Sequence, residues 1–446
     1  MEPSRIAGRL RTRKLASKED FFLEYSATLG AEARYWLAVA LLAPVAWYFV
    51  ARVNQADFLV FLHAGRAVLH GSSPYPKLGS AAVYSGSAFV YPYWTALAFV
   101  PLALLGTHLA TLLWVAASML AYAVVVHLLL GPDALAYGLF ILASPMLISL
   151  QMGTLTPWLA LGVVLAWRQR NRPVAAAVLL ALAATAKIFL LPILLFLLAS
   201  RRYRASVAAL VSTAALVGAG FAIGPLGMIG YGHLLLSLAG HEGTQSWSFM
   251  GLSEALGASS LGAKLLLAAV AGSGAALLLG RSRNQGDDAA LLAGLLGISL
   301  FVTPILWSSY LPLAAVALLV LVPNRNLLAL FSLSSWLLVT ADRAGIGGDV
   351  LAIAVVMALS VIDVFSSRPK EMPQLQVELR RAVSRLVPTT RWGTVFALGL
   401  GASLAILAVA EPASAAAIAV QALLVASVVG AIRMPAPKRD NTLITR

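Results

Sequence analysis

Long apolar segments recur along most of the chain, and the short loops between them carry most of its charge. The first segment is Tyr35–Val53, and comparable ones follow as far as Ala413–Ile432. A helix needs about 20 apolar residues to cross the hydrocarbon core of a bilayer. Because that core offers no water to unpaired backbone groups, only helices and closed barrels cross it. The chain is therefore predicted to be an all-α polytopic membrane protein with about 12–14 helices.

Composition excludes several classes of function. Of the 446 residues, 60% are hydrophobic and 11% are charged, whereas soluble domains carry about 25% charged residues. There is no cysteine, which excludes disulfides and thiolate metal sites. No polar stretch reaches the roughly 50 residues of a small soluble domain, and no nucleotide-binding motif is present. An activated substrate must therefore be membrane-borne or arrive from the external side.

The distribution of basic residues predicts the orientation of the chain. A formal net charge of +14 would suggest nucleic acid binding in a soluble protein. Here the basic residues gather in loops, as the positive-inside rule describes for cytoplasmic loops. We expect no nucleic acid partner and a monomeric, multi-pass protein of the cell inner (plasma) membrane. The basic N-terminal segment 1–34 and the tail 433–446 should both be cytoplasmic.

This orientation divides the chain into parts. A transmembrane core over 35–365 is expected to be followed by a cytoplasmic linker over 366–391 and a helix pair over 392–432. Within the core, loops 54–93 and 224–260 should be external, and they are expected to form the active site.

Three segments of the core are less regular than the rest. We expect Trp94–Leu105 to be an interfacial helix that precedes the crossing helix His108–Leu130, and Ala134–Ser149 to be one crossing. Basic loops flank Pro173–Ala199 on both sides, so this segment must enter and leave on one face. It should contain two short helices that meet near Lys187.

Asp57 lies four residues beyond the first apolar segment, at the head of the first predicted external loop. A carboxylate at a membrane boundary is costly to desolvate, so it usually has a partner or a function. One interpretation is a helix cap, since Asp57 precedes a predicted helix over Phe58–His70. A carboxylate there gains about 0.3–1 kcal/mol from the helix dipole. The aromatic and hydroxyl side chains that follow suit sugar rings, but such aromatics also collect at membrane interfaces.

Lys187 interrupts an apolar run. It either extends its ammonium group to the interface or meets an anion. At the apex of a hairpin, a lipid phosphate is its natural partner, and we favour that interpretation.

Weaker signals occur in three other places. His241 and Glu242 could form half of a metal site, but adjacent side chains rarely converge on one ion, so a solvated loop is favoured. The polar break from Thr303 to Tyr310 could line a pocket or form a turn. Gln151 and Thr154 should supply hydrogen bonds between helices.

Several short motifs occur along the chain in an order typical of one superfamily. In chain order they are Asp57-Phe58, Gly71-Ser72-Ser73-Pro74-Tyr75, Tyr91-Pro92, Pro101-Leu102 with Trp114, Ser144-Pro145 with Gln151, Ala184 to Lys187 with Arg201-Arg202, and Thr303-Pro304 with Trp307 and Tyr310. Together they resemble the polyprenol-phosphate-dependent glycosyltransferases of the GT-C superfamily. The bacterial branch that includes polyprenol-phosphate-mannose mannosyltransferases is the most similar.

The resemblance implies a GT-C-type helix bundle that transfers a sugar, with mannose expected, from a polyprenyl-phosphate donor to a glycolipid or glycan acceptor. Transfer would occur on the external (periplasmic) face with inversion. It implies Asp57 as general base and Lys187 as the ligand of the donor phosphate. It implies no required cofactor, although other GT-C branches use a metal ion. Further substrate-binding positions would be Tyr75, Tyr91, Gln151, Thr154, His241, Trp307, Ser309 and Tyr310.

Two departures from the family pattern bear on the substrate. Relatives often have Gly-Gln-x-Asn where this chain has Gln151-Met152-Gly153-Thr154, and His or Asp where it has Ser308 and Ser309. The alternatives are a flippase or transporter of a lipid-linked sugar and a scaffold subunit of an envelope-synthesis complex. A transporter would more often show inverted repeats and mid-bilayer charges, which this sequence lacks.

Overall fold

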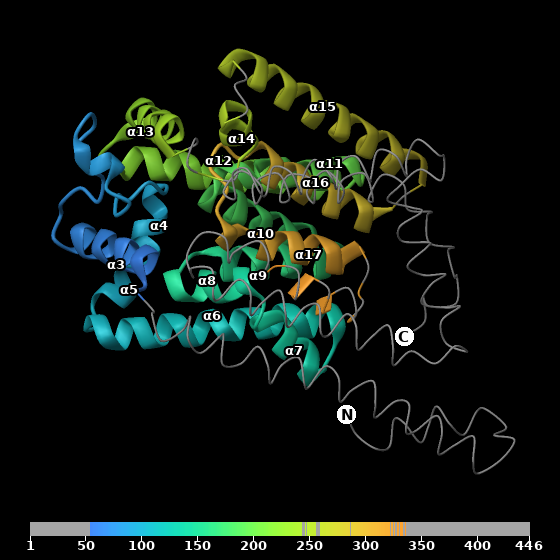
Figure 1. Ribbon diagram of the computed structural model, residues 1–446, viewed down its shortest axis with the longest axis horizontal. Helices are drawn as coiled ribbons and strands as arrows, with labels where there is room; N and C mark the ends of the chain where they lie inside the picture. The colour runs from blue at the N-terminus through green and yellow to red at the C-terminus, as the bar shows by residue number, and fades with distance from the viewer. Residues whose placement is uncertain are drawn as a thin grey trace, which may run out of the picture.

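The computed structural model describes residues 54–335, apart from 243–245, 247, 256–258, 286, 322, 324, 326–327, 330 and 333–334. Over these residues every regular element is a helix (Figure 1), so the all-α prediction is confirmed. The predicted first crossing, the linker 366–391, the pair 392–432 and both terminal segments lie outside the described residues. In chain order the α-helices and 3₁₀-helices (η) are α3 (Ala56–Leu69), η1 (Ala81–Tyr84), α4 (Tyr93–Ala98), α5 (Val100–Ala103), α6 (Thr107–Leu130), α7 (Ala134–Ile141), α8 (Ser144–Met152), α9 (Thr156–Arg168), α10 (Pro173–Ala186), η2 (Ile188–Leu194), α11 (Leu195–Ala199), α12 (Tyr203–Ile223), α13 (Gly227–Glu242), α14 (Phe249–Ala255), α15 (Ser260–Gln285), α16 (Asp288–Val302), η4 (Ser308–Tyr310) and α17 (Pro312–Leu321).

Three of the described helices are long and apolar enough to cross a bilayer, namely α6, α12 and the Ser260–Gly280 part of α15. A fourth crossing results if the bent pair α7 and α8 is counted as one. These helices support the prediction of a membrane protein. The predicted interfacial segment Trp94–Leu105 forms the two short helices α4 and α5, and the predicted crossing His108–Leu130 coincides with α6.

The segment Ala134–Ser149, which was predicted to be one crossing, is not one straight helix. It divides into α7 and α8, whose axes differ by 66°. Ala143 between them is extended and Pro145 occupies the first turn of α8. Proline has no N–H to donate to the preceding turn, so it starts a helix more readily than it continues one. Ser144 completes the break because its backbone N–H and its hydroxyl both bond to Ser335.

The hairpin predicted around Lys187 is present. Helix α10 ends at Ala186, Lys187 itself is extended with φ −135° and ψ 104°, and η2 begins at the next residue. The second arm starts as the 3₁₀-helix η2 and continues as the α-helix α11. Pro192 within η2 supplies a reason, since it cannot donate the hydrogen bond that an α-helix requires.

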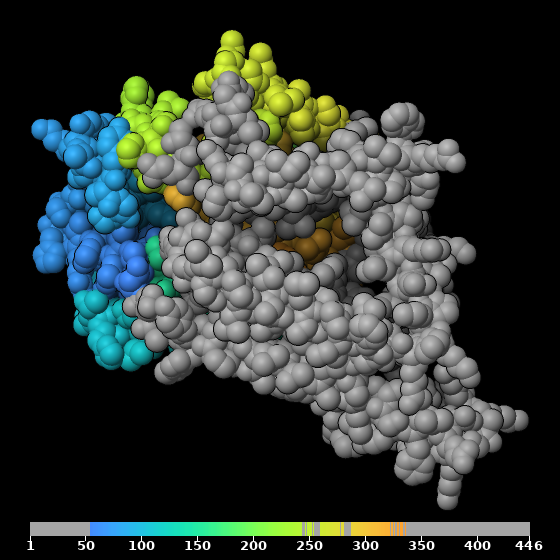
Figure 2. All heavy atoms as spheres, viewed as in Figure 1, coloured from blue at the N-terminus to red at the C-terminus, as the bar shows by residue number. Residues whose placement is uncertain are grey.

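The predicted external loops come together at one end of the bundle. Helices α3, α4, α5 and α13 lie there, and the same blue and green segments form that end of the molecular surface (Figures 1 and 2). Segment 224–260, which was predicted to be a loop, contains the helices α13 and α14. Val83 of η1 and Leu234 of α13 share a small apolar cluster, and the Tyr231 hydroxyl donates to the Val90 carbonyl oxygen at 3.1 Å. These contacts join the two loops into one layer.

Candidate active site

A cavity of about 570 Å³ lies where this layer meets the bundle. Small-molecule sites commonly measure about 300–1,000 Å³. Its walls come from α3, α8, α13, segment 83–91, the turn at 186–189 and segment 302–310. Of the residues that the structure describes, three charged ones line it, Asp57, Lys187 and Glu242, and most of the remaining lining is apolar or aromatic. The arrangement suits an amphipathic substrate with a charged or polar reacting group.

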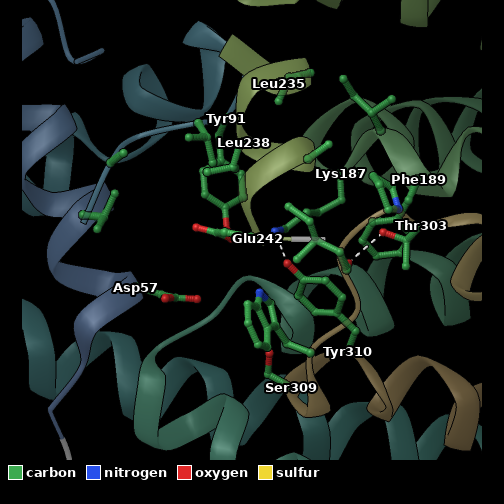
Figure 3. Close-up of a pocket in the computed structure, with 18 of the residues that line it drawn as sticks. Asp57, Tyr91, Lys187, Phe189, Leu235, Leu238, Glu242, Thr303, Ser309 and Tyr310 are labelled. Atoms are coloured by element: carbon green, nitrogen blue, oxygen red, sulfur yellow. Dashed lines mark hydrogen bonds between the residues drawn. The ribbon is translucent and has the colours of Figure 1, made fainter. Parts of the chain in front are cut away.

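Asp57 lies in the first turn of α3 and its carboxylate points into the cavity (Figure 3). It is not the N-cap residue, because Gln55 occupies that position. Burial raises the pKa of the Asp57 carboxyl above its ordinary value, and the nearby charge of Lys187 opposes this change. The carboxylate is thus a stronger proton acceptor than an exposed aspartate, which is the property that a general base needs.

A set of hydrogen bonds fixes the start of α3 to the end of α8 and the turn that follows it. The Gln55 backbone N–H donates to the Gln151 carbonyl oxygen at 3.0 Å, and its Nε2 donates to the Leu150 carbonyl oxygen at 2.6 Å. Trp114 Nε1 donates to the Gly153 carbonyl oxygen at 3.0 Å from the other side. Asp57 is therefore positioned through a neighbouring residue that is bonded to a separate helix.

Gly153, in the turn after α8, packs closely against the start of α3. Its φ of +70° is a left-handed conformation that glycine adopts readily. A Cβ at this position would stand 2.5 Å from both Gln55 Oε1 and Phe58 Cβ. A residue other than glycine would press directly on the segment that carries Asp57.

Lys187 reaches the cavity from the opposite wall. Its Nζ donates to the Tyr310 hydroxyl at 2.7 Å, and it lies 4.4 Å from the centre of the Tyr91 ring. The aromatic faces stabilise the ammonium group by cation–π attraction. Among the described residues no carboxylate stands within ion-pair distance of Lys187. In this part of the chain Lys187 therefore has no acidic partner, which favours the anion-binding interpretation over extension to the interface.

The predicted site residues divide into two groups. Tyr91, Trp307, Ser309 and Tyr310 line the cavity with Asp57 and Lys187, as does Thr303. The other four stand behind the wall. The Tyr75 hydroxyl donates to the Tyr91 carbonyl oxygen at 2.9 Å, and the His241 ring lies 4.5 Å from the Tyr84 ring. Gln151 belongs to the last turn of α8, and Thr154 follows that helix.

Two lining residues with polar side chains, Tyr231 and Glu242, were not among the predicted site residues. Tyr231 and Glu242 both reach the cavity from α13, whereas Glu242 was expected in a solvated loop. A sequence signal existed for Glu242, because it is the single acid in segment 224–242. Its helix could not be foreseen from composition alone. Among the described residues, no three side chains of the types that bind metals come together.

Residues 89–308 match the model of glycosyltransferase family 87. This is a family of the GT-C type, so the match supports a membrane glycosyltransferase and leaves the mannosyltransferase branch open. The matched segment includes Tyr91, Lys187 and Glu242, whereas Asp57 and Tyr310 stand outside it. No curated protein and no solved structure matches the chain.

Proposed function

We propose that this protein transfers a sugar, mannose in the first instance, from a polyprenyl-phosphate donor to a hydroxyl group of a glycolipid or glycan acceptor, with inversion. The observation that carries the proposal is the placement of Asp57 and Lys187 on opposite walls of one cavity. The cavity lies in the layer built from the two predicted external loops, so the reaction is assigned to the external face of the membrane.

The reaction follows from these two groups. The Asp57 carboxylate takes the proton of the acceptor hydroxyl, whose oxygen forms a bond to the anomeric carbon of the donor sugar. The bond from that carbon to the phosphate oxygen breaks, and polyprenyl phosphate leaves with the electron pair. Proton removal by a placed base contributes about 10²–10⁴-fold. Lys187 stabilises the negative charge that develops on the departing phosphate oxygen.

The apolar part of the cavity suits the lipid part of the donor. Ile188, Phe189 and Ile305 line it beside Lys187. The hairpin beyond Lys187 also presents apolar side chains on its surface, with Ile188 43%, Leu191 41% and Leu195 39% exposed. A prenyl chain can lie along this surface while its phosphate reaches the ammonium group.

Transfer is tested with the purified full-length protein, synthetic polyprenyl-phospho-mannose and a glycolipid acceptor. We expect a glycosylated product of inverted anomeric configuration, read by NMR. Asp57→Asn should remove turnover while the protein stays folded. Asp133→Asn is the matched control, because Asp133 caps α7 and pairs with Arg325 outside the cavity, and asparagine also caps helices well.

Two results would contradict the proposal. Transport of the lipid-linked sugar across vesicle membranes without any transfer product would support the transporter alternative. Full turnover in Asp57→Asn would remove Asp57 as the base.

A further inference from the structure

One face of α13 forms a wall of the cavity. Tyr231, Leu235, Leu238 and Glu242 line it at helical spacing, so they project from the same side of the helix. Glu242 is the last residue of α13 and the polar end of an otherwise apolar and aromatic face. Its carboxylate points toward the centre of the cavity (Figure 3).

This position is unfavourable for a carboxylate in three ways. The C-terminal end of a helix carries partial negative charge, which repels an anion. Burial raises the pKa of the Glu242 carboxyl, since water is partly withdrawn from its charge, although the charges of His241 and Lys187 oppose this increase more than that of Asp57 adds to it. Among the described residues no hydrogen bond or ion pair holds the carboxylate, and its neighbour His241 lies against the Tyr84 ring. Glu242 is therefore a partly buried carboxylate whose oxygens are available to a ligand.

A polar ligand in the cavity would supply hydrogen bonds to this carboxylate. Asp57 faces the acceptor hydroxyl and Lys187 faces the donor phosphate, so the donor sugar ring must lie between them. Glu242 faces the same space and interacts electrostatically with both groups. A carboxylate has two oxygens that accept hydrogen bonds from adjacent hydroxyl groups, and hydrogen bonds to an ionised acceptor are about twice as strong as neutral ones.

We propose that Glu242 binds hydroxyl groups of the donor sugar and selects a neutral, hydroxylated sugar as the transferred group. The inference rests on the proposed glycosyl transfer. A sugar that carries a carboxylate of its own would meet two acidic side chains, those of Asp57 and Glu242, and would be rejected. Glu242 is thus assigned to donor recognition, whereas Asp57 is assigned to proton removal.

The test compares donors and variants in one assay. The donors are polyprenyl-phospho-mannose and its four monodeoxy analogues, and the variants are Glu242→Gln and Glu242→Ala with Asp133→Asn as the matched control. For Glu242→Gln we expect kcat/KM to fall about 10–100-fold, chiefly through the donor KM. At least one monodeoxy donor should lose a comparable factor in the wild type. In Glu242→Ala that donor and the parent donor should react equally well, because the same contact is already absent.

A structural role predicts a different pattern. A carboxylate that only supports the fold would lower the unfolding temperature when replaced, whereas we expect Glu242→Gln to unfold at the same or a higher temperature. The inference is overturned if no monodeoxy donor is impaired in the wild type, a result that needs no variant to fold. It is also overturned if the variants discriminate among the donors as the wild type does. Absence of transfer by the wild type from the parent donor would instead refute the proposed function, and the inference with it.

Discussion

Replacement of Gly153 by alanine tests whether the turn after α8 positions Asp57. Two separate effects act on this substitution. The left-handed conformation costs a residue with a Cβ about 1–2 kcal/mol. The new Cβ also stands 2.5 Å from Gln55 Oε1 and from Phe58 Cβ, and overpacking of this kind typically costs about 1–3 kcal/mol. We expect the free energy of unfolding to fall by about 2–5 kcal/mol in total.

A matched control separates the two effects. Gly71 follows α3 with a φ of +67°, and the backbone N–H of the next residue, Ser72, bonds five residues back to Ala67. Gly153 has the same arrangement, with a bond from Thr154 to Ser149. Nothing lies within 4 Å of a Cβ built on Gly71. Gly71→Ala should therefore show only the conformational cost, about 1–2 kcal/mol, with unchanged turnover.

The assay combines thermal unfolding in detergent with the sugar-transfer rate at saturating donor. Movement of α3 displaces the base, and a misplacement of about 1 Å can cost about 10²-fold in rate. We expect kcat of Gly153→Ala to fall by at least about tenfold in the fraction of protein that remains folded. Equal stability loss and full turnover in both variants would refute the positioning role of this turn.

Four further predictions concern Asp57, Lys187 and Tyr310. Because burial raises the pKa of Asp57, kcat/KM should fall on the acid side with a midpoint above the ordinary value of about 3.9. For the same reason the Asp57→Asn variant should be more stable than the wild type at neutral pH. This difference in stability should vanish at a pH low enough to protonate the carboxyl in both the folded and the unfolded state. Unfolding temperatures measured over a pH series check the direction of the effect. Lys187→Met should raise the donor KM about 10–100-fold with little change in the acceptor KM, and an effect confined to the acceptor would contradict the phosphate role. Tyr310→Phe removes the hydroxyl that accepts from Lys187 Nζ at 2.7 Å, so kcat/KM should fall about 3–10-fold, and an unchanged value would show that this bond does not orient the lysine.

The parts of the structure that the sequence predicted are those fixed by local rules. A long apolar run predicted α6, and the flanking arginines predicted the hairpin around Lys187. Asp57 and Lys187 stood out because charge is rare in this chain. Their placement in one cavity follows from the packing of segments more than 100 residues apart, which no local pattern encodes.

The features that the sequence did not predict have physical causes of the same kind. Ala134–Ser149 has continuous apolar character, but Ala143 and Pro145 divide it into two helices. Glu242 was assigned to a solvated loop because His241 and Glu242 are adjacent and polar. The structure places them at the end of a helix, where one contacts an aromatic ring and the other faces the cavity. Tertiary packing of α13 against η1 decided that outcome.

The length of α10 bears on how a donor lipid reaches Lys187. Its 14 residues rise about 21 Å, which is less than the roughly 30 Å depth of a hydrocarbon core. If the helix starts at the cytoplasmic boundary, as its flanking arginines predict, its far end stops short of the opposite headgroups. A donor would have to sink its phosphate several ångströms below its resting plane. Reconstitution into bilayers of graded thickness should then show faster transfer in the thinner ones, because the descent becomes shorter.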